Sequence, residues 1–224
     1  QRRFEDMTGC TLVEGYGLSE TSPVVTINPL TGDGKAGSVG LPLPGTVIRI
    51  VSTENPGKVL PTGERGEVCI KGPQVMAGYA NRARENIEVF EGGYLRTGDI
   101  GYLDEDGYLF IVDRIKDLIL SGGFNVYPRN VEEAIYRHAA VAEVTVIGVP
   151  DPKWDQNVKA VVIRREGVEV DAQALIDHCR DRMASYKKPK IVHFVDSLPR
   201  TAQGFVDRAA VDADFGGGGY PSVG

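Results

Sequence analysis

Cysteine is scarce in this sequence, with three residues in 224, and the three lie far apart at Cys10, Cys69 and Cys179. None belongs to a Cys-x-x-Cys pair or to a Cys/His pattern with the spacing of a zinc site. The sequence therefore gives no sign of a disulfide framework or of a structural metal. Three separate thiols are typical of a reducing compartment.

Long apolar runs and an excess of positive charge are absent as well. No apolar stretch approaches the ~18 residues of a membrane span, and we expect no signal peptide. The formal net charge of −6 argues against a general affinity for nucleic acid, so local groups would have to hold any anionic ligand. We expect a cytoplasmic protein without a nucleic-acid partner.

The two ends of the sequence differ from its middle. The chain begins with "QRRFEDMTGC", which has no initial Met and leads directly into a structured-looking motif. It closes on "DADFGGGGYPSVG", which has little to bury. We expect the start to be a cut inside a domain and residues 209–224 to form a disordered Gly-rich tail.

The first half of the chain has the pattern of a β-rich domain. Short β-prone runs at Val47–Val51 and Glu67–Lys71 lie between Gly/Pro turns, and "EDGYLFIVDR" adds a further strand after the turn at 104–107. We expect residues 1–115 to be the C-terminal part of a large domain, built as a distorted β-barrel.

The second half has the pattern of a small α+β domain. Pro128 can begin a helix whose apolar face holds Val131, Ala134 and Ile135. "AEVTVIGV" and "VKAVVIRR" follow as strands, Asp171 can cap a second helix, and "IVHFV" is a last strand. We expect this domain to occupy residues 116–208.

Four motifs occur in a fixed order along the chain: "GYGLSET", "YLRTGDIGYLDEDGYLFIVDRIKDLILSGGFNVYP", "YKKPK" and "LPRTAQGFVDR". Together they resemble the adenylate-forming ligases, and "GYGLSETSPVVTINP" with "GPQVMAGY" is most similar to the bacterial long-chain fatty acyl-CoA ligases. The resemblance covers nearly everything from Gly9 to Arg208. It implies an enzyme that activates a fatty acid with ATP and Mg²⁺ to an acyl-adenylate. The enzyme then transfers the acyl group to coenzyme A with release of AMP, after its C-terminal lid domain has rotated.

The resemblance also implies roles for the residues of the first motif. Tyr16 would form an aromatic wall against adenine, with Gly17 beside it in the nucleotide site. Ser19 would hydrogen-bond phosphate. Glu20 would be catalytic as a ligand of Mg²⁺, which favours hard oxygen ligands.

Later motifs supply the remaining implied roles. Asp99 would accept hydrogen bonds from the ribose hydroxyls, and Arg114 would reach the same ribose. Lys116 stands where the family has its hinge residue. Gly122 and Gly123 would line the tunnel for the pantetheine arm of coenzyme A, because glycine lets a ligand approach the backbone closely.

Two features depart from the family pattern. The sequence has no Ser/Thr/Gly-rich phosphate loop ending in Lys, so we expect a C-terminal portion that is inactive alone. In the closing loop, Phe205 stands at the position of the expected catalytic Lys. This favours a non-catalytic homologue as one alternative; natural loss, deliberate substitution and sequence error all remain open. Asp155, in "DPKWDQ", stands where the family usually has glycine, so we expect strain there.

The substrate and the partners stay open in part. A ligase for a medium-chain or aromatic acid is the second alternative, because most of the acyl pocket would lie upstream. A fatty substrate implies peripheral contact at the inner face of the membrane. The oligomeric state cannot be deduced from the sequence.

Overall fold

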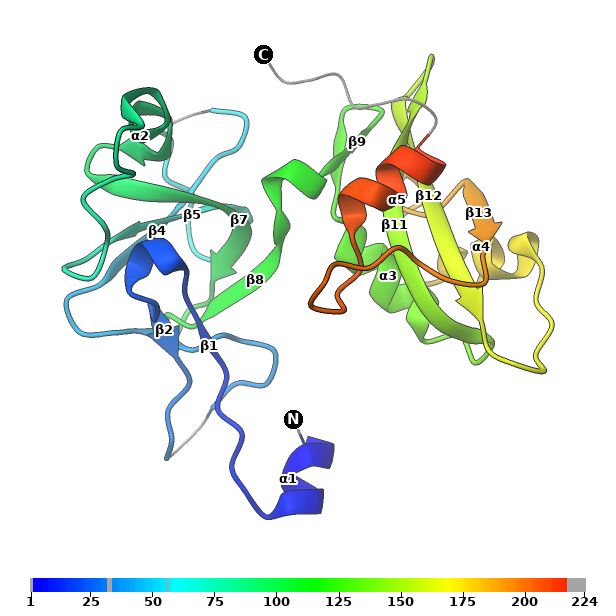
Figure 1. The fold of residues 1–224 in the computed structure, drawn as a ribbon, viewed down its shortest axis with the longest axis horizontal. Helices are drawn as coiled ribbons and strands as arrows, with labels where there is room; N and C mark the ends of the chain where they lie inside the picture. The colour runs from blue at the N-terminus through cyan, green and yellow to red at the C-terminus, as the bar shows by residue number, and fades with distance from the viewer. Residues whose placement is uncertain (1, 32–33, 56, 217–224) are drawn as a thin grey trace. The chain divides into compact units, whose positions relative to one another are not determined.

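The structure is a computed structural model and describes residues 2–31, 34–55 and 57–216. The chain divides into two compact units, Gln1–Ile115 and Lys116–Gly224 (Figure 1). Unit 1 is rich in β-strands, whereas unit 2 combines strands with helices. This confirms the predicted combination of a curled, barrel-like sheet and a small α+β arrangement.

The described residues of unit 1 form two antiparallel sheets, of three and of five strands. The first has the order β1-β2-β3; the second has the order β4-β5-β7-β6, and β8 pairs with β7. The elements are α1 (Arg2–Thr8), β1 (Gly15–Tyr16), η1 (Ser19–Thr21), β2 (Thr26–Ile27), β3 (Leu41–Pro42), β4 (Val47–Val51), β5 (Gly66–Lys71), α2 (Ala83–Val89), β6 (Phe90–Glu91), β7 (Tyr94–Leu103) and β8 (Leu109–Arg114). Both strands predicted by residue range, β4 and β5, are therefore present.

The strand β5 is buried on both faces, and one of these faces contributes to the main core of unit 1. Val68 and Ile70 join a cluster with Val25, Ile50 and Leu109, against which Tyr16 packs. This cluster fixes the strand that carries Tyr16 against the larger sheet.

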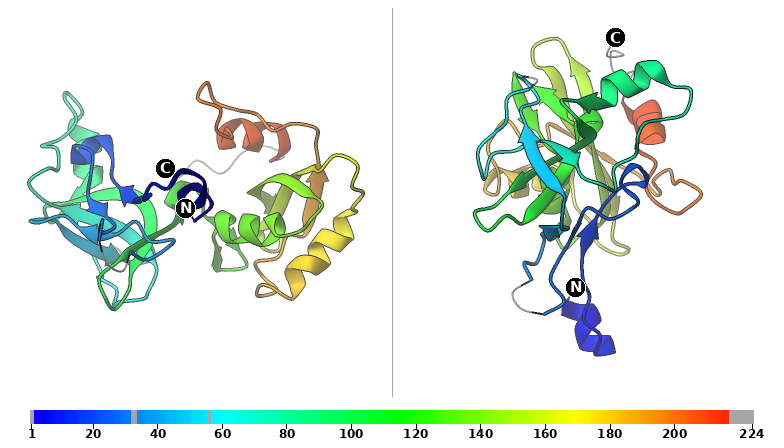
Figure 2. Two further views of the ribbon diagram at one scale, coloured as in Figure 1. Left: turned by 90° about the horizontal axis from the view of Figure 1, so that it is seen from below. Right: turned by 90° about the vertical axis from the view of Figure 1, so that its left-hand side faces the viewer.

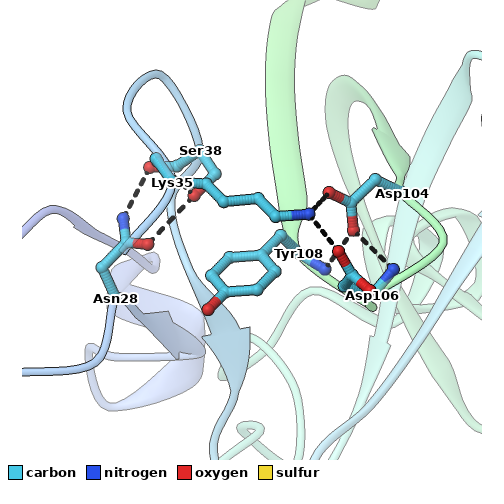
Figure 3. Close-up of polar contacts among 6 residues, drawn as sticks. All are labelled: Asn28, Lys35, Ser38, Asp104, Asp106 and Tyr108. Atoms are coloured by element: carbon cyan, nitrogen blue, oxygen red, sulfur yellow. Dashed lines mark hydrogen bonds and ion pairs between the residues drawn. The ribbon is translucent and has the colours of Figure 1, made fainter. Parts of the chain in front are cut away.

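A lysine ties the loop after β2 to the turn between β7 and β8 (Figure 3). Lys35 Nζ lies 2.5 Å from Asp104 Oδ2 and 2.5 Å from Asp106 Oδ2, and 4.8 Å from the centroid of the Tyr108 ring. Gly107 in that turn has a φ of 83°, a conformation that favours glycine. The predicted turn at 104–107 is confirmed, and its acidic side chains also hold the distant loop that carries Lys35.

In unit 2, the residues up to 216 form one five-stranded sheet with the order β10-β9-β12-β11, and β13 pairs with β12 in parallel. Its elements are η2 (Ile115–Asp117, which begins in unit 1), β9 (Ile119–Ser121), β10 (Phe124–Val126), α3 (Pro128–Tyr136), β11 (Val141–Asp151), β12 (Asp155–Arg164), α4 (Ala172–Arg180), β13 (Ile191–Phe194) and α5 (Arg208–Phe215). The left view of Figure 2 shows α3 and α4 on one face of this sheet and α5 on the other.

Alternation along β12 explains why both faces of the sheet are covered. Val158, Ala160 and Val162 pack in the cluster that includes α3 and α4, whereas Val161 packs in the cluster of α5. In α3 the predicted face is buried, and Asp171 caps α4 by accepting a hydrogen bond from the Ala174 backbone N–H at 2.7 Å. Both helix predictions are confirmed.

The prediction of a disordered tail over 209–224 is wrong for residues 209–215. Asp207 caps α5 by accepting a hydrogen bond from the Ala210 backbone N–H at 3.1 Å. Val211 is fully buried and Phe215 packs in the same cluster, one helical turn later. Packing against the apolar second face of the sheet therefore stabilises this helix. Residues 217–224 lie outside the described part of the chain.

Candidate functional site

The centre of the candidate site is a buried carboxylate. Asp99, in β7, is 5% exposed and lies opposite Arg114, in β8, in the antiparallel register. Tyr16 Oη donates a hydrogen bond to Asp99 Oδ2 at 2.7 Å, and Arg114 Nε lies 3.3 Å from Asp99 Oδ1. The first motif supplies Tyr16 and the second supplies Asp99 and Arg114, and the fold of unit 1 brings these three residues together.

The local backbone conformation around Asp99 places its carboxylate. Gly98 has a φ of 71°, and the Asp99 backbone N–H donates to Thr97 Oγ1 at 3.0 Å. Thr97 Oγ1 itself donates to the Val68 carbonyl oxygen at 2.8 Å, which ties the segment to β5. A carboxylate has about four acceptor sites, so Tyr16 and Arg114 leave Asp99 with capacity for further donors.

Burial and the neighbouring carboxylate act on Tyr16 in the same direction. Burial disfavours the phenolate, and the hydrogen bond to Asp99 favours the neutral phenol, so the pKa of Tyr16 lies well above its ordinary value. Tyr16 therefore remains a hydrogen-bond donor to Asp99 throughout the physiological range.

Gly17 is required by its backbone surroundings. A Cβ at this position would lie 1.5 Å from the Pro23 carbonyl oxygen, which no side chain can tolerate. The turn brings the chain back so that Val25 N–H donates to the Tyr16 carbonyl at 2.8 Å. Gly17 thus has a packing reason to be glycine, and its predicted contact with a nucleotide stays a prediction.

Ser19 and Glu20 lie in the short 3-10 helix η1, just after the strand that carries Tyr16. Glu20 is half-buried, and its Oε1 accepts a hydrogen bond from Tyr79 Oη at 2.6 Å. That bond, together with the Glu20 backbone N–H, lowers the pKa of Glu20. The carboxylate is therefore ionised at neutral pH, as a metal ligand must be.

The described residues do not surround Glu20 with a cluster of side chains that could enclose a metal ion. Among the residues that the structure describes, no group of three or more His, Cys, Asp or Glu is arranged to hold a metal ion. A single carboxylate is nevertheless consistent with Mg²⁺, which commonly takes one or two carboxylates and completes its shell with phosphate and water.

Lys116, Gly122 and Gly123 lie in unit 2. Lys116 is exposed in η2 at the boundary between the units. Gly122 and Gly123 form the two-residue turn between β9 and β10, with φ values of 59° and 79°. Positive φ at both positions is typical of a type I′ hairpin turn. A Cβ on Gly122 would lie 2.6 Å from the Trp154 ring, so glycine is required there for close packing too.

Phe205 projects from a well-defined loop. Its side chain is 72% exposed, although it is a phenyl ring. The Thr201 N–H donates to the Phe205 carbonyl at 2.8 Å, Arg200 Nη1 donates to the Gly204 carbonyl at 2.9 Å, and Gly204 has a φ of 87°. The loop therefore presents the side chain at position 205 to solvent.

Two residues of the site had no predicted role. Thr97 orients the Asp99 backbone, and its position in "RTGDIG" within the second motif was the available signal. Tyr79 bonds Glu20 from a segment 59 positions away, and its only signal was its place in "GPQVMAGY".

Comparisons with known proteins match both units. A family model described as "AMP-binding enzyme" matches residues 1–80, and one described as "AMP-binding enzyme C-terminal domain" matches residues 130–204. A long-chain-fatty-acid–CoA ligase of Bacillus subtilis (strain 168) is 48% identical over 208 residues, which are 93% of this chain and 37% of that protein. A feruloyl-CoA synthase of Amycolatopsis sp is 41% identical over 209 residues, 93% of this chain and 42% of that protein. The chain thus spans well under half the length of these relatives.

Solved structures match over almost the whole chain. ATP-bound MatB from Rhodopseudomonas palustris has a TM-score of 0.88 and 39% identity, covering 96% of this chain and 42% of that one. The o-succinylbenzoate CoA synthetase MenE from Bacillus subtilis, in complex with its acyl-adenylate intermediate, has a TM-score of 0.80 and 37% identity, covering 93% and 42%. Among the described residues, none of the helices has the length and apolarity needed to cross a bilayer.

Proposed function

This chain belongs to the AMP-binding, adenylate-forming enzymes, and we propose that it supplies the C-terminal portion of an ATP-dependent fatty acid–CoA ligase. In the first half-reaction, a carboxylate oxygen of the acid attacks the α-phosphate of ATP and pyrophosphate leaves. In the second, the thiol of coenzyme A attacks the acyl carbon and AMP leaves. The chain would contribute part of the nucleotide site in unit 1 and the lid domain in unit 2.

The observation that carries this proposal is the Tyr16–Asp99–Arg114 cluster. Asp99 is a buried, fixed carboxylate with acceptor capacity left, so it suits a pair of ribose hydroxyls. Hydrogen bonds to a charged acceptor are worth roughly 1.5–3 kcal/mol each. Arg114 has a side chain that is 58% exposed, so its guanidinium is accessible to the same ligand.

The remaining ligands follow from residues with suitable chemistry. Glu20 would hold Mg²⁺ together with the phosphates of ATP, whose charge the ion would neutralise, and Ser19 would donate to a phosphate oxygen. The turn at Gly122 and Gly123 would pass beside the pantetheine arm of coenzyme A. Lys116, exposed at the boundary, would be the hinge.

Long-chain fatty acid is the substrate we favour. Proteins named as long-chain-fatty-acid–CoA ligases are 42–48% identical to this chain. The feruloyl-CoA synthase at 41% favours an aromatic acid almost as well, so a ligase for an aromatic or medium-chain acid is the second candidate. A fatty substrate partitions into bilayers, and we therefore propose a cytoplasmic enzyme with peripheral contact at the inner membrane face.

Phe205 bears on the first half-reaction alone. A cation at this position would stabilise charge that develops during transfer, and the loss of a single oxyanion-hole donor costs roughly 10²–10³ in rate. An exposed phenyl ring offers no donor, so adenylation should be slowed at least that much. A non-catalytic homologue that retains the fold is the candidate from a different functional class.

The test uses the longer protein with its upstream part restored, carrying either Phe205 or Phe205→Lys. Pyrophosphate release from ATP and palmitate reports adenylation, and thioester formation from prepared palmitoyl-adenylate and coenzyme A reports the second step. We expect Phe205→Lys to raise only the first rate, by at least ~10²-fold. If the Phe205 protein adenylates at full rate, the role assigned to this position is wrong. If neither protein performs either step, the non-catalytic homologue is supported. The 224-residue chain alone should show neither reaction.

A further inference from the structure

Glu20 is contacted twice by one segment of unit 1 that the proposed function leaves unused. Tyr79 Oη donates to Glu20 Oε1 at 2.6 Å, and the Met76 backbone N–H donates to the Glu20 carbonyl oxygen at 2.8 Å. The segment 76–79 therefore fixes both the backbone and the carboxylate of Glu20. The hydrogen bond from Tyr79 engages Oε1 and does not use Oε2.

Tyr79 is itself held by a side chain of α2. Asn86 Oδ1 accepts a hydrogen bond from the Tyr79 backbone N–H at 2.7 Å, and Asn86 Nδ2 donates to the Tyr79 carbonyl oxygen at 2.9 Å. The preceding residue, Gly78, has a φ of 144°, and a Cβ there would lie 3.0 Å from Asn86 Oδ1. A side-chain amide thus clamps the Tyr79 backbone from both sides, and the glycine allows the close approach.

This arrangement is unusual for an exposed side chain. Tyr79 is 38% exposed, and an exposed phenol would ordinarily hydrogen-bond to water and sample several rotamers. Here the Asn86 clamp and the bond to Glu20 hold it at both ends. Neither contact is needed to bury apolar surface, so a role in placing the Glu20 carboxylate accounts for both.

We propose that Tyr79, held by Asn86, is a positioning residue that presents Glu20 Oε2 to the Mg²⁺ of the bound nucleotide. The inference rests on the proposed metal role of Glu20. Mg²⁺ demands nearly ideal octahedral geometry and takes few carboxylates, so a single oxygen that is already placed favours binding. Immobilising a free side chain on binding opposes affinity, and prior placement removes that cost.

The magnitude follows from the freedom that Glu20 would regain. Without Tyr79 Oη, the carboxylate can rotate, and ordering it again should weaken Mg²⁺ binding by about 3- to 10-fold. Tyr79→Phe removes the one hydroxyl and retains the ring. Asn86→Ala leaves the hydroxyl in place and removes its support, so we expect a smaller effect in the same direction.

The experiment measures ATP binding by calorimetry at graded Mg²⁺ concentrations, using the longer protein with its upstream part restored. The half-saturating Mg²⁺ concentration should rise about 3- to 10-fold in Tyr79→Phe, while ATP affinity at saturating Mg²⁺ stays as in the unmodified protein. Tyr136→Phe, which removes a hydroxyl from an exposed tyrosine of α3, is the matched control and should change neither quantity. A Tyr79→Phe protein that behaves like Tyr136→Phe would overturn the inference.

Glu20→Gln separates this inference from the proposed function. If Glu20→Gln raises the half-saturating Mg²⁺ concentration and Tyr79→Phe does not, the positioning role fails and the metal role stands. If Glu20→Gln has no effect, both fail. A second readout is independent of the metal: carboxyl NMR of the 224-residue chain should show a higher pKa for Glu20 in Tyr79→Phe, because the donor to the charged form is gone. An unchanged Glu20 pKa would show that the hydrogen bond does not form in solution.

Discussion

Replacing Tyr16 by Phe tests the central hydrogen bond of the candidate site without changing its shape. Asp99 is 5% exposed, and Tyr16 Oη donates to it at 2.7 Å, so the substitution leaves a buried carboxylate short of one donor. A hydrogen bond to a charged group contributes roughly 1.5–3 kcal/mol. Arg114 still lies 3.3 Å away, with its side chain open to solvent, and can compensate in part. We therefore expect Tyr16→Phe to lower the free energy of unfolding by about 2 kcal/mol.

The pH dependence of this loss distinguishes the hydrogen bond from simple packing. The pKa of folded Tyr16 is raised by burial and by Asp99, so the phenol stays protonated when the unfolded chain would ionise near pH ~10. The stability that this group contributes is fully present below that pH and falls as the pH rises toward the folded pKa. The decline is at most about 1.4 kcal/mol per pH unit. The Tyr16→Phe chain has no such group. The difference in free energy of unfolding between it and the unmodified chain should therefore shrink above pH ~10.

The assay is urea unfolding of the 224-residue chain between pH 7 and 10.5, with hydrogen exchange of the β7 and β8 amides as a local measure. Tyr136→Phe serves as the control, because Tyr136 is 53% exposed and should lose little stability. If Tyr16→Phe and Tyr136→Phe are equally stable, or if their difference does not change with pH, the reasoning about Tyr16 and Asp99 is refuted.

Two further predictions concern backbone strain and thiol reactivity. Asp155 has a φ of 60°, so Asp155→Gly should relieve left-handed strain of about 1 kcal/mol. The greater freedom of the unfolded chain offsets part of this gain, and the net free energy of unfolding should rise by about 0.5 kcal/mol. Thermal unfolding followed by the fluorescence of the single Trp measures the change. Asp155→Ala should instead lower the free energy of unfolding, and equal effects of the two would exclude strain as the cause. Cys10 is exposed, whereas burial raises the pKa of Cys69 to about 12 and that of Cys179 to about 11. A thiol reagent at pH 8 should therefore modify one cysteine rapidly in the folded chain and three in urea. Cys10→Ser should abolish the rapid phase. A rapid phase that persists in Cys10→Ser would place a second reactive thiol at the surface.

Local patterns predicted those features whose causes are local. The apolar spacing in α3 identified its buried face, and Asp171 identified the start of α4, because both depend on neighbours within four residues. The strain at Asp155 is of the same kind, since a hairpin turn sets φ within a few residues. Tyr16, Asp99 and Arg114 were expected at one nucleotide site because the resemblance implied it, not because a local pattern links residues 83 positions apart.

Contacts between distant segments could not be read in the same way. α5 has a cap at Asp207 and an apolar pair at Val211 and Phe215, but those signals are weak without the second face of the sheet to pack against. Only the fold reveals that β12 is buried on both sides and therefore requires a covering element there. The bond from Tyr79 to Glu20 is similar, because no periodicity links residues 59 positions apart.

The loop at Phe205 shows that the conformation of a presenting loop and the chemistry of the presented side chain are separate properties. The loop is closed by the backbone pair of Thr201 and Phe205, by the bond from Arg200 to the Gly204 carbonyl, and by the positive φ of Gly204. None of these interactions uses the side chain at position 205. A lysine could therefore replace Phe205 without any rearrangement of the loop, and the change would add a cation at a position that is already exposed. For this reason Phe205→Lys tests chemistry alone: a gain in adenylation could not be attributed to refolding of the loop.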